Sequence, residues 1–336
     1  MSTYQPPFVV TPLILNQVIE IGELMGHWAA MAGRASPLLR KENRIRTIQA
    51  SLAIEHNSLT TEQVTALMEG KRILAPAKDI QEVRNAILAY EKMSEWKSEQ
   101  LSDLLQAHRV LMLGLVDNPG QLRAGNVGVY REKQLIHMAP PASQVLRLMN
   151  DLLGWLKTTE IHPLIAGAVF HYEFEFIHPF ADGNGRMGRL GRLWQTLILC
   201  EWRSELAWLP VETLIHYQQD RYYQVLGQCD RQSSCTPFIE FILENIISAL
   251  QEGLGKPSTL SEEMSEEMSE EMSSDLLDIE KRILQILSNQ PGRSAKSIAD
   301  ECEISARTVE RYLKALQLKG KLQRVGATKG GIWRVL

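Results

Sequence analysis

The chain has 336 residues, too many for a single small core and about right for one large domain and one small domain. Its composition, 44% hydrophobic and 23% charged, is that of an ordinary globular protein. The 36 basic and 40 acidic residues give a net charge of −4, which excludes a general affinity for nucleic acid and leaves room only for a local basic patch.

The first residues show no sign of a targeting segment. They lack the basic stretch, apolar core and small-residue cleavage site of a signal peptide. No run of about 18 apolar residues occurs, so we expect no membrane span. The cysteines lack the paired spacing of metal ligands, which favours free thiols in a reducing compartment and a cytoplasmic protein. They are Cys200, Cys229, Cys235 and Cys302.

The first ~250 residues are predicted to be mainly helical because apolar residues recur at helical spacing. Thr60 and Thr61 precede Glu62 and are expected to cap a further short helix. The helical pattern covers residues 14–28, 44–55, 80–93, 101–115, 145–156 and 165–176.

Residues 119–141 interrupt the helical pattern. Two apolar pairs, Val129-Tyr130 and Leu135-Ile136, flank the polar turn 131–133, and glycines precede them. Short apolar runs around a polar turn are typical of a β-hairpin. The sequence therefore predicts a hairpin inserted into a helical domain.

The composition changes after Gly253. Three copies of Ser-Glu-Glu-Met, beginning at Ser261, predict an acidic, solvated linker, with a short exposed helix as the alternative. Helices over 279–287, 295–301 and 306–319, followed by a hairpin, are then predicted, and this order is that of a winged helix-turn-helix. Residues 277–336 hold twelve basic and six acidic residues, which favours DNA as a partner. Protein docking or dimerisation is the alternative.

Residues 178–189 read His-Pro-Phe-Ala-Asp-Gly-Asn-Gly-Arg-Met-Gly-Arg. Gly183, Asn184 and Gly185 form a turn just before a new helix that is predicted over 186–202. Main-chain N–H groups at such a turn, together with the helix dipole, favour bound anions. A glycine turn alone would be weak evidence for a phosphate site.

The side chains around this turn make the evidence specific. Arg186 and Arg189 carry guanidinium groups suited to phosphate oxygens. Asp182 supplies a hard oxygen ligand for Mg²⁺, and His178 could take a proton from an incoming hydroxyl. A phosphate cradle, two cations, a metal ligand and a base predict phosphoryl or nucleotidyl transfer.

The segment resembles the signature of the Fic family, His-x-Phe-x-(Asp/Glu)-Gly-Asn-Gly-Arg-x-x-Arg, and every fixed position is present. The resemblance extends over about residues 40–250. It implies transfer of AMP from ATP to a Ser, Thr or Tyr hydroxyl of a protein, with release of pyrophosphate and Mg²⁺ as cofactor. It also implies that His178 is the general base, Asp182 the Mg²⁺ ligand and Phe180 a buried anchor of the loop.

The resemblance further implies the ATP-binding residues. The hairpin resembles the family's flap, about residues 128–140, which would receive the target by strand addition. Tyr222 and Tyr223 resemble an aromatic pair near the adenine, with core packing as the alternative. Asp230 stands where relatives often carry asparagine. The predicted set is Leu135, Ile136, His137, Met138, Asp182, Gly183, Asn184, Gly185, Arg186, Met187, Gly188, Arg189, Tyr222, Tyr223 and Asp230.

Ser51 and Glu55 resemble the family's inhibitory motif, (Ser/Thr)-x-x-x-Glu-(Gly/Asn), with His56 in the last position. The motif implies that the Glu55 carboxylate pairs with Arg189 and removes the cation that seats the γ-phosphate of ATP. An exposed glutamate without a role is the alternative.

Together these patterns predict a mainly α protein with a Fic helical bundle, a hairpin flap and a winged helix. The predicted parts are an N-terminal helical region 1–110, a catalytic core 111–252, a linker 253–276 and the winged helix 277–336. We expect an AMP-transferring homodimer that acts on a protein, which could be the chain itself. A DNA-binding regulator that senses nucleotide is the alternative, and another nucleotide donor or the removal of AMP also stays open.

Overall fold

The computed structural model describes residues 4–32, 37–131, 134–181, 186–255 and 282–302. Beyond residue 302 it describes residues 309, 313, 316–317, 321–325 and 332–335. The chain divides into two compact units, Met1–Leu260 and Ser261–Leu336. The predicted acidic linker and most of the predicted third helix of the C-terminal unit lie outside the described residues. The finer division of the first unit stays a prediction.

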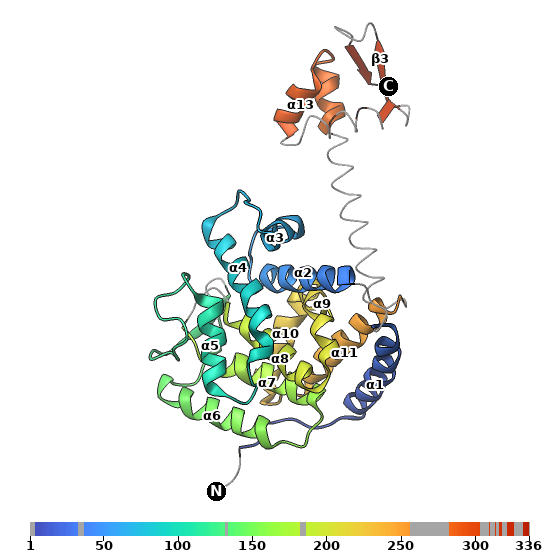
Figure 1. Cartoon of the computed structure of the whole chain (residues 1–336). Coiled ribbons are helices and arrows are strands. Elements are labelled where there is room, and N and C mark those ends of the chain that lie inside the picture. Colours follow the sequence, from blue (N-terminus) through green and yellow to red (C-terminus); the bar gives the residue numbers. More distant parts are fainter. Residues whose placement is uncertain are drawn as a thin grey trace. The chain divides into compact units, whose positions relative to one another are not determined.

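The first unit is built mainly from helices, as predicted (Figure 1). The short 3₁₀ helices Met93–Glu95 and Ser204–Trp208 join some of them. The predicted helices are all present, although most extend beyond the predicted ends and α5 stops earlier. The bounds are α1 Pro12–Ala32, α2 Pro37–Ala53, α3 Thr61–Met68, α4 Ala77–Lys92, α5 Leu101–Met112, α6 Ala142–Thr158, α7 Pro163–Ile177, α8 Arg186–Trp202, α9 Val211–Tyr217, α10 Gln219–Gln232 and α11 Thr236–Gly253.

The predicted cap of α3 is confirmed. The Thr60 hydroxyl accepts a hydrogen bond from the Gln63 N–H at 3.3 Å, and the Gln63 side chain accepts one from the Thr60 N–H at 3.0 Å. This reciprocal pair is a capping box, which satisfies main-chain donors that the first helical turn leaves without partners.

Helix α7 lies at the centre of the first unit (Figure 1). Every residue from Leu164 to Phe174 is buried, since α7 is apolar around most of its circumference. Helix α8 packs along it, α11 and α6 also contact it, and α1 lies against α11. Because α7 ends directly before the 178–189 segment and α8 begins inside it, the site is supported by the most buried pair of helices.

The predicted hairpin is confirmed as strands β1 (Gly128–Arg131) and β2 (Gln134–Met138), which pair antiparallel. Val129 lies opposite His137, and the register shifts between Val129 and Tyr130. Such a bulge bends a strand and changes the direction of its side chains.

The described part of the C-terminal unit follows the predicted order of elements. Residues 282–289 are helical, α13 spans Ala295–Cys302, and β3 (Leu322–Val325) pairs antiparallel with β4 (Ile332–Val335). The unit has its own small core. Its buried residues are Ile283, Ile286, Leu287, Ile298, Ala299, Val309, Leu313, Leu316, Leu322 and Trp333.

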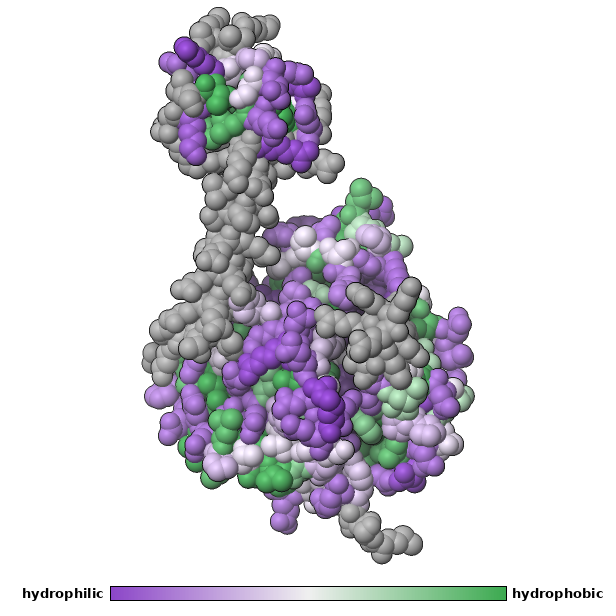
Figure 2. Space-filling view, turned by 180° about the vertical axis from the view of Figure 1, so that it is seen from behind, coloured by the Kyte–Doolittle hydropathy of each residue, from purple (hydrophilic) through white to green (hydrophobic). Residues whose placement is uncertain are grey.

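The visible face of the molecule in Figure 2 is mainly hydrophilic, with smaller hydrophobic areas between. Large apolar side chains that stay exposed include Leu13, Leu15 and Ile19 on α1. Among the described helices, none has both the length and the apolar character that crossing a bilayer requires.

Candidate active site

His178 ends helix α7. Its N–H donates to the Phe174 carbonyl at 3.0 Å, and its φ of 49° and ψ of 64° place it in the left-handed region. Pro179 then prevents the helix from continuing. His178 is therefore the residue at which the chain leaves α7 and enters the motif loop. Four predicted site residues of that loop, Asp182, Gly183, Asn184 and Gly185, lie outside the described residues.

Phe180 is completely buried, as predicted for a loop anchor. Its ring stacks on the ring of His108, with centroids 3.7 Å apart and an interplanar angle of 6°, and lies 6.3 Å from the ring of Phe174. His108 belongs to α5 and Phe174 to α7, so Phe180 fixes the loop against two helices.

Helix α8 presents three buried arginines at intervals of three residues. Arg186, Arg189 and Arg192 are 4%, 0% and 2% exposed. Residues at this spacing share one face of a helix. Buried cations require countercharges or hydrogen-bond acceptors, and the N-terminal helices provide them.

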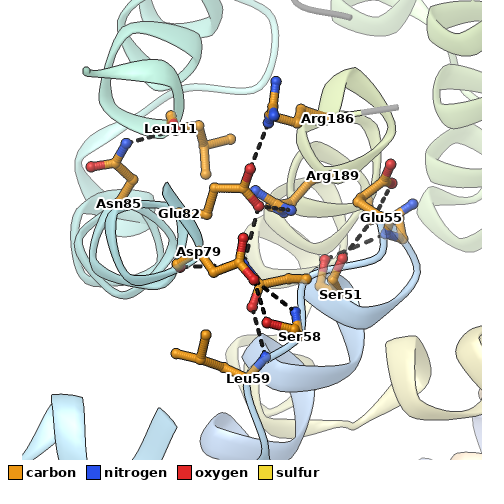
Figure 3. Close-up of polar contacts among 12 residues, drawn as sticks. Ser51, Glu55, Ser58, Leu59, Asp79, Glu82, Asn85, Leu111, Arg186 and Arg189 are labelled. Carbon is orange, nitrogen blue, oxygen red and sulfur yellow. Dashed lines mark hydrogen bonds and ion pairs between the residues drawn. The ribbon is translucent and has the colours of Figure 1, made fainter. Parts of the chain in front are cut away.

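Glu82 on α4 binds two of these arginines (Figure 3). Its Oε1 accepts a hydrogen bond from Arg186 Nε at 2.7 Å, and its Oε2 accepts from Arg189 Nη2 at 3.4 Å and from Asn57 Nδ2 at 3.2 Å. Burial opposes ionisation of Glu82, but these donors outweigh it and leave the pKa of Glu82 below its usual value. No motif in the sequence marks Glu82 as a site residue.

Arg189 keeps donors that no described residue uses. Its Nε and Nη1 are buried and have no hydrogen-bond partner within the described part of the chain. Burial lowers the pKa of Arg189, although the charges of Glu55 and Glu82 oppose that shift. Because unsatisfied buried donors are costly, these N–H groups fit a site that receives an anion.

Glu55 is buried beside the same helix, so the alternative of an exposed glutamate is wrong. Its side chain is 3% exposed, and its Oε1 accepts a hydrogen bond from Arg192 Nη2 at 2.6 Å. A Cβ at Gly188 would lie only 3.1 Å from the same oxygen, so a side chain here would press on the Glu55 carboxylate. We expected Glu55 to pair with Arg189. The ion pair is instead with Arg192, while the charge of Glu55 still acts on Arg189.

Ser51 also binds Arg192, which donates from Nη2 to the Ser51 carbonyl at 3.1 Å and from Nε to the hydroxyl at 3.4 Å. Ser51 and Glu55 lie four residues apart and thus share one face of the helix end. Arg192, three residues beyond the predicted motif, is therefore the arginine of α8 that binds both Ser51 and Glu55 of the predicted inhibitory segment.

The end of α2 explains the last position of the inhibitory motif. The Asn57 N–H donates to the Leu52 carbonyl at 3.1 Å, and the His56 N–H donates to the Ala53 carbonyl at 2.9 Å. These two bonds, with His56 at a φ of 62°, form a Schellman cap. Glycine and asparagine adopt this left-handed conformation readily, and histidine is also enriched in it. His56 therefore keeps the geometry despite its departure from the motif.

The flap is joined to the helical core through His137. Its Nδ1 lies 2.8 Å from Asp230 Oδ2 and its Nε2 lies 2.9 Å from the Phe176 carbonyl oxygen. The Tyr172 hydroxyl donates to the other oxygen of Asp230 at 2.8 Å. Asp230, predicted to bind ATP, thus holds the flap strand in this structure.

The other predicted nucleotide contacts are divided between core and surface. Tyr222 is 2% exposed, and its hydroxyl lies 3.1 Å from His171 Nε2, whereas Tyr223 is 38% exposed. Met138 at the end of β2 is 59% exposed. Their contacts with a nucleotide stay predictions.

The bond between flap and core is expected to weaken as the pH rises. Both ring nitrogens of His137 face acceptors, so both donate only when the ring is protonated. Burial lowers the pKa of His137, but Asp230 and the Phe176 carbonyl outweigh it and raise the pKa above its ordinary value. A raised folded-state pKa gives stability that is complete below the unfolded value and lost as the pH passes the folded value.

The test compares the melting temperatures of the wild type and Asp230→Asn between pH 5.5 and 9. The asparagine oxygen can still accept from Tyr172 but removes the charge that faces His137. We expect the variant to be less stable at low pH and the difference to shrink with rising pH. A difference that does not change with pH would contradict this role of the pair.

Comparisons with known proteins agree with this geometry. Residues 98–194 match the Fic/DOC family, and residues 276–323 match a winged helix-turn-helix DNA-binding family. The Protein adenylyltransferase Fic of Aedes aegypti is 30% identical over 235 residues, 66% of this chain and 44% of that protein. The corresponding protein of Drosophila virilis is 29% identical over 271 residues, 76% of this chain and 52% of that protein. The chain thus spans about half the length of the curated relatives it matches.

Solved structures extend the likeness to the whole chain. A Fic family protein from Desulfovibrio desulfuricans G20 is 44% identical and has a TM-score of 0.71, and the match covers 99% of this chain and 98% of that one. Fic-1 from Caenorhabditis elegans, at 22% identity and a TM-score of 0.56, shares the fold over 72% of this chain and 71% of that one. On this motif, this fold and a match over its full length, the chain belongs to the Fic family.

Proposed function

We propose that the chain is a protein adenylyltransferase that moves AMP from ATP to a Ser, Thr or Tyr hydroxyl of a protein. Relatives at about 29% identity are named protein adenylyltransferases. The observation that carries the proposal is the pair Arg186 and Arg189 at the start of α8, with two buried donors of Arg189 that find no partner among the described residues. Such donors at a helix N-terminus suit a polyphosphate.

At the α-phosphorus the reaction forms one P–O bond and breaks one. The acceptor hydroxyl oxygen attacks the α-phosphorus of ATP, and the bond between that phosphorus and the bridging oxygen to the β-phosphate breaks. Pyrophosphate leaves with the bonding electrons, and His178 takes the hydroxyl proton. Arg186 and Arg189 hold the outer phosphates and stabilise the charge that develops on the leaving group.

Mg²⁺ fits this proposal as a companion of the nucleotide. Across the described ranges no group of three or more His, Cys, Asp and Glu side chains could hold a metal. Asp182 would therefore share the ion with phosphate oxygens, as is usual for Mg²⁺ in phosphate sites. The ion would neutralise phosphate charge.

The flap supplies the place for the acceptor. Strand β2 belongs to a sheet of two strands, so its outer edge can pair with an extended segment of a target protein. His137 fixes β2 to α7 and α10, and thus sets the distance between a bound target and His178. Transfer from another nucleotide donor, or removal of AMP, would use the same phosphate contacts, so both stay open as alternatives.

The C-terminal unit favours DNA as an additional partner. Its match to a DNA-binding winged helix and its net charge of about +6 support contact with phosphates. We also propose a cytoplasmic homodimer, as expected from the sequence. A transcriptional regulator that senses nucleotide is the second candidate, supported by the same winged helix.

The test uses ATP labelled at the α- or the γ-phosphate, with the Glu55→Gly variant and Mg²⁺. Label from α-labelled ATP that stays on denatured protein, with none from γ-labelled ATP, would establish AMP transfer. Retained γ-label would instead indicate phosphoryl transfer. No label from either nucleotide, with ATP still bound, would favour the regulator.

Replacing Glu55 with glycine should raise AMP transfer severalfold. The carboxylate binds Arg192 at 2.6 Å and acts on Arg189, so its removal frees this face of α8 for the γ-phosphate. The initial rate of label transfer measures the effect. Glu42→Gln, at an exposed position of α2, the helix that ends just before Glu55, is the matched control and should leave the rate unchanged, whereas Glu55→Gln should raise it. Equal rates for Glu55→Gly and the wild type, with the fold intact, would count against inhibition by Glu55.

A further inference from the structure

Arg123 is a buried arginine in the segment between α5 and the flap, outside every motif in the sequence. It is 5% exposed and forms no ion pair with a carboxylate in the described part of the chain. Buried arginines are ordinarily paired with an acid, because an isolated buried charge is costly. Burial lowers the pKa of Arg123 accordingly.

Main-chain carbonyl groups replace the missing acid. Arg123 Nε donates to the His178 carbonyl at 2.7 Å, and Nη2 donates to the Ile177 carbonyl at 3.2 Å. The Arg123 N–H donates to the Pro179 carbonyl at 2.9 Å. The last carbonyls of a helix have no partner within the helix, and a cation at this end is favourable. Arg123 therefore holds the end of α7 at the residue that carries the base.

The same guanidinium also holds the base of the flap. Nη1 donates to the Gly125 carbonyl at 2.8 Å and Nη2 donates to the Pro140 carbonyl at 2.5 Å. Gly125 precedes β1 and Pro140 follows β2, so the two bonds bracket the hairpin. One planar group thus fixes both ends of the flap relative to His178.

We propose that Arg123 is a positioning residue for AMP transfer, which sets His178 and the flap in a single geometry; this inference rests on the proposed function. His178 has a left-handed backbone at the end of α7, and the bond from Arg123 Nε to its carbonyl holds the main chain in that geometry. A target segment on the flap then meets the base at a fixed distance, which proton transfer in the attack requires.

Geometry decides why this residue is arginine. The guanidinium has five N–H donors in a fixed plane. Here its nitrogens donate to four main-chain carbonyls, two at the end of α7 and two at the base of the flap. A lysine keeps the charge but has a single nitrogen, which cannot donate both to the end of α7 and to the two ends of the flap. Arg123→Lys should therefore loosen the link between flap and base while leaving the phosphate-binding arginines of α8 in place.

The experiment places Arg123→Lys in the Glu55→Gly background, with Arg147→Lys as the matched control on an exposed face of α6, where Arg147 binds Asp151. We expect Arg123→Lys to lower kcat about tenfold or more while KM for ATP changes less than twofold. Hydrogen exchange should speed up in peptides 124–141 and 174–181 together and stay unchanged in α11. The control should show neither effect. Arg123→Ala should recover part of its kcat in millimolar guanidinium. This rescue tests the same role of the guanidinium even if the lysine variant folds poorly.

Two results would overturn the proposal. One is a kcat equal to that of the control, with exchange unchanged in both peptides. The other is an equal loss of kcat and ATP affinity with a general rise in exchange, which would indicate an ordinary structural residue. If the Glu55→Gly background transfers no AMP, the proposed function fails, and the exchange measurements still decide whether Arg123 couples the flap to His178.

Discussion

Replacing His178 with alanine should lower the rate of AMP transfer by about 10²- to 10⁴-fold, the usual contribution of a general base. The residue ends α7 and has no second histidine beside it in the 178–189 segment that could take its place. Single-turnover transfer of α-labelled AMP in the Glu55→Gly background measures the loss directly, because it separates chemistry from product release.

His27→Ala is the control for this prediction, since His27 is exposed on α1, away from the 178–189 segment in sequence. It should leave the rate unchanged. ATP should bind to the His178→Ala protein with nearly unchanged affinity, because the proposed phosphate contacts come from α8. A His178→Ala protein that keeps more than about a tenth of the rate would show that another group, or water, accepts the proton.

Replacing Phe180 with alanine should destabilise the first unit by about 3–5 kcal/mol, the range for deleting a buried phenylalanine. The ring is 0% exposed and stacks on His108, so its removal leaves a buried cavity. Urea unfolding followed by tryptophan fluorescence measures the change. Transfer should also fall, because the loop that carries the phosphate cradle loses its anchor.

The matched variants are Phe180→Leu and Phe176→Ala. Leucine keeps most of the apolar volume, so we expect a smaller loss, on the order of 1–1.5 kcal/mol. Phe176 is 36% exposed, and its removal should cost less than that of Phe180. Similar stabilities for Phe180→Ala and Phe176→Ala would show that the loop is held by its main chain and not by the buried ring.

The sequence predicts the helices and the hairpin well because their signals are local. Apolar spacing marks α7 and α8, and a capping residue marks α3. The motif loop is equally visible, since its chemistry lies within twelve consecutive residues. Structure adds the stacking of Phe180 on His108 and the burial of the arginines on α8.

Glu82 and Arg123 could not be found in the same way. Each acts on residues more than fifty positions away, through contacts that depend on how α4 or the segment before the flap packs. A lone glutamate or arginine in such a segment has the appearance of a surface residue, because charged residues are rarely fully buried. The sequence predicts Arg189 as the partner of Glu55, whereas the structure pairs Glu55 with Arg192, for a related reason. Arg189 and Arg192 lie about one turn apart on α8, and only the packing of α2 decides between them.

The three arginines of α8 also help to decide which part of the chain can fold on its own. The segment that matches the Fic/DOC family, residues 98–194, contains these cations but neither of the carboxylates that bind them. Removing one partner of a buried ion pair typically costs about 3–5 kcal/mol, and here the loss would occur at two sites. We therefore expect that a fragment cut at the family boundaries does not fold on its own. The hallmark motif of the protein depends for its stability on helices that the motif does not include.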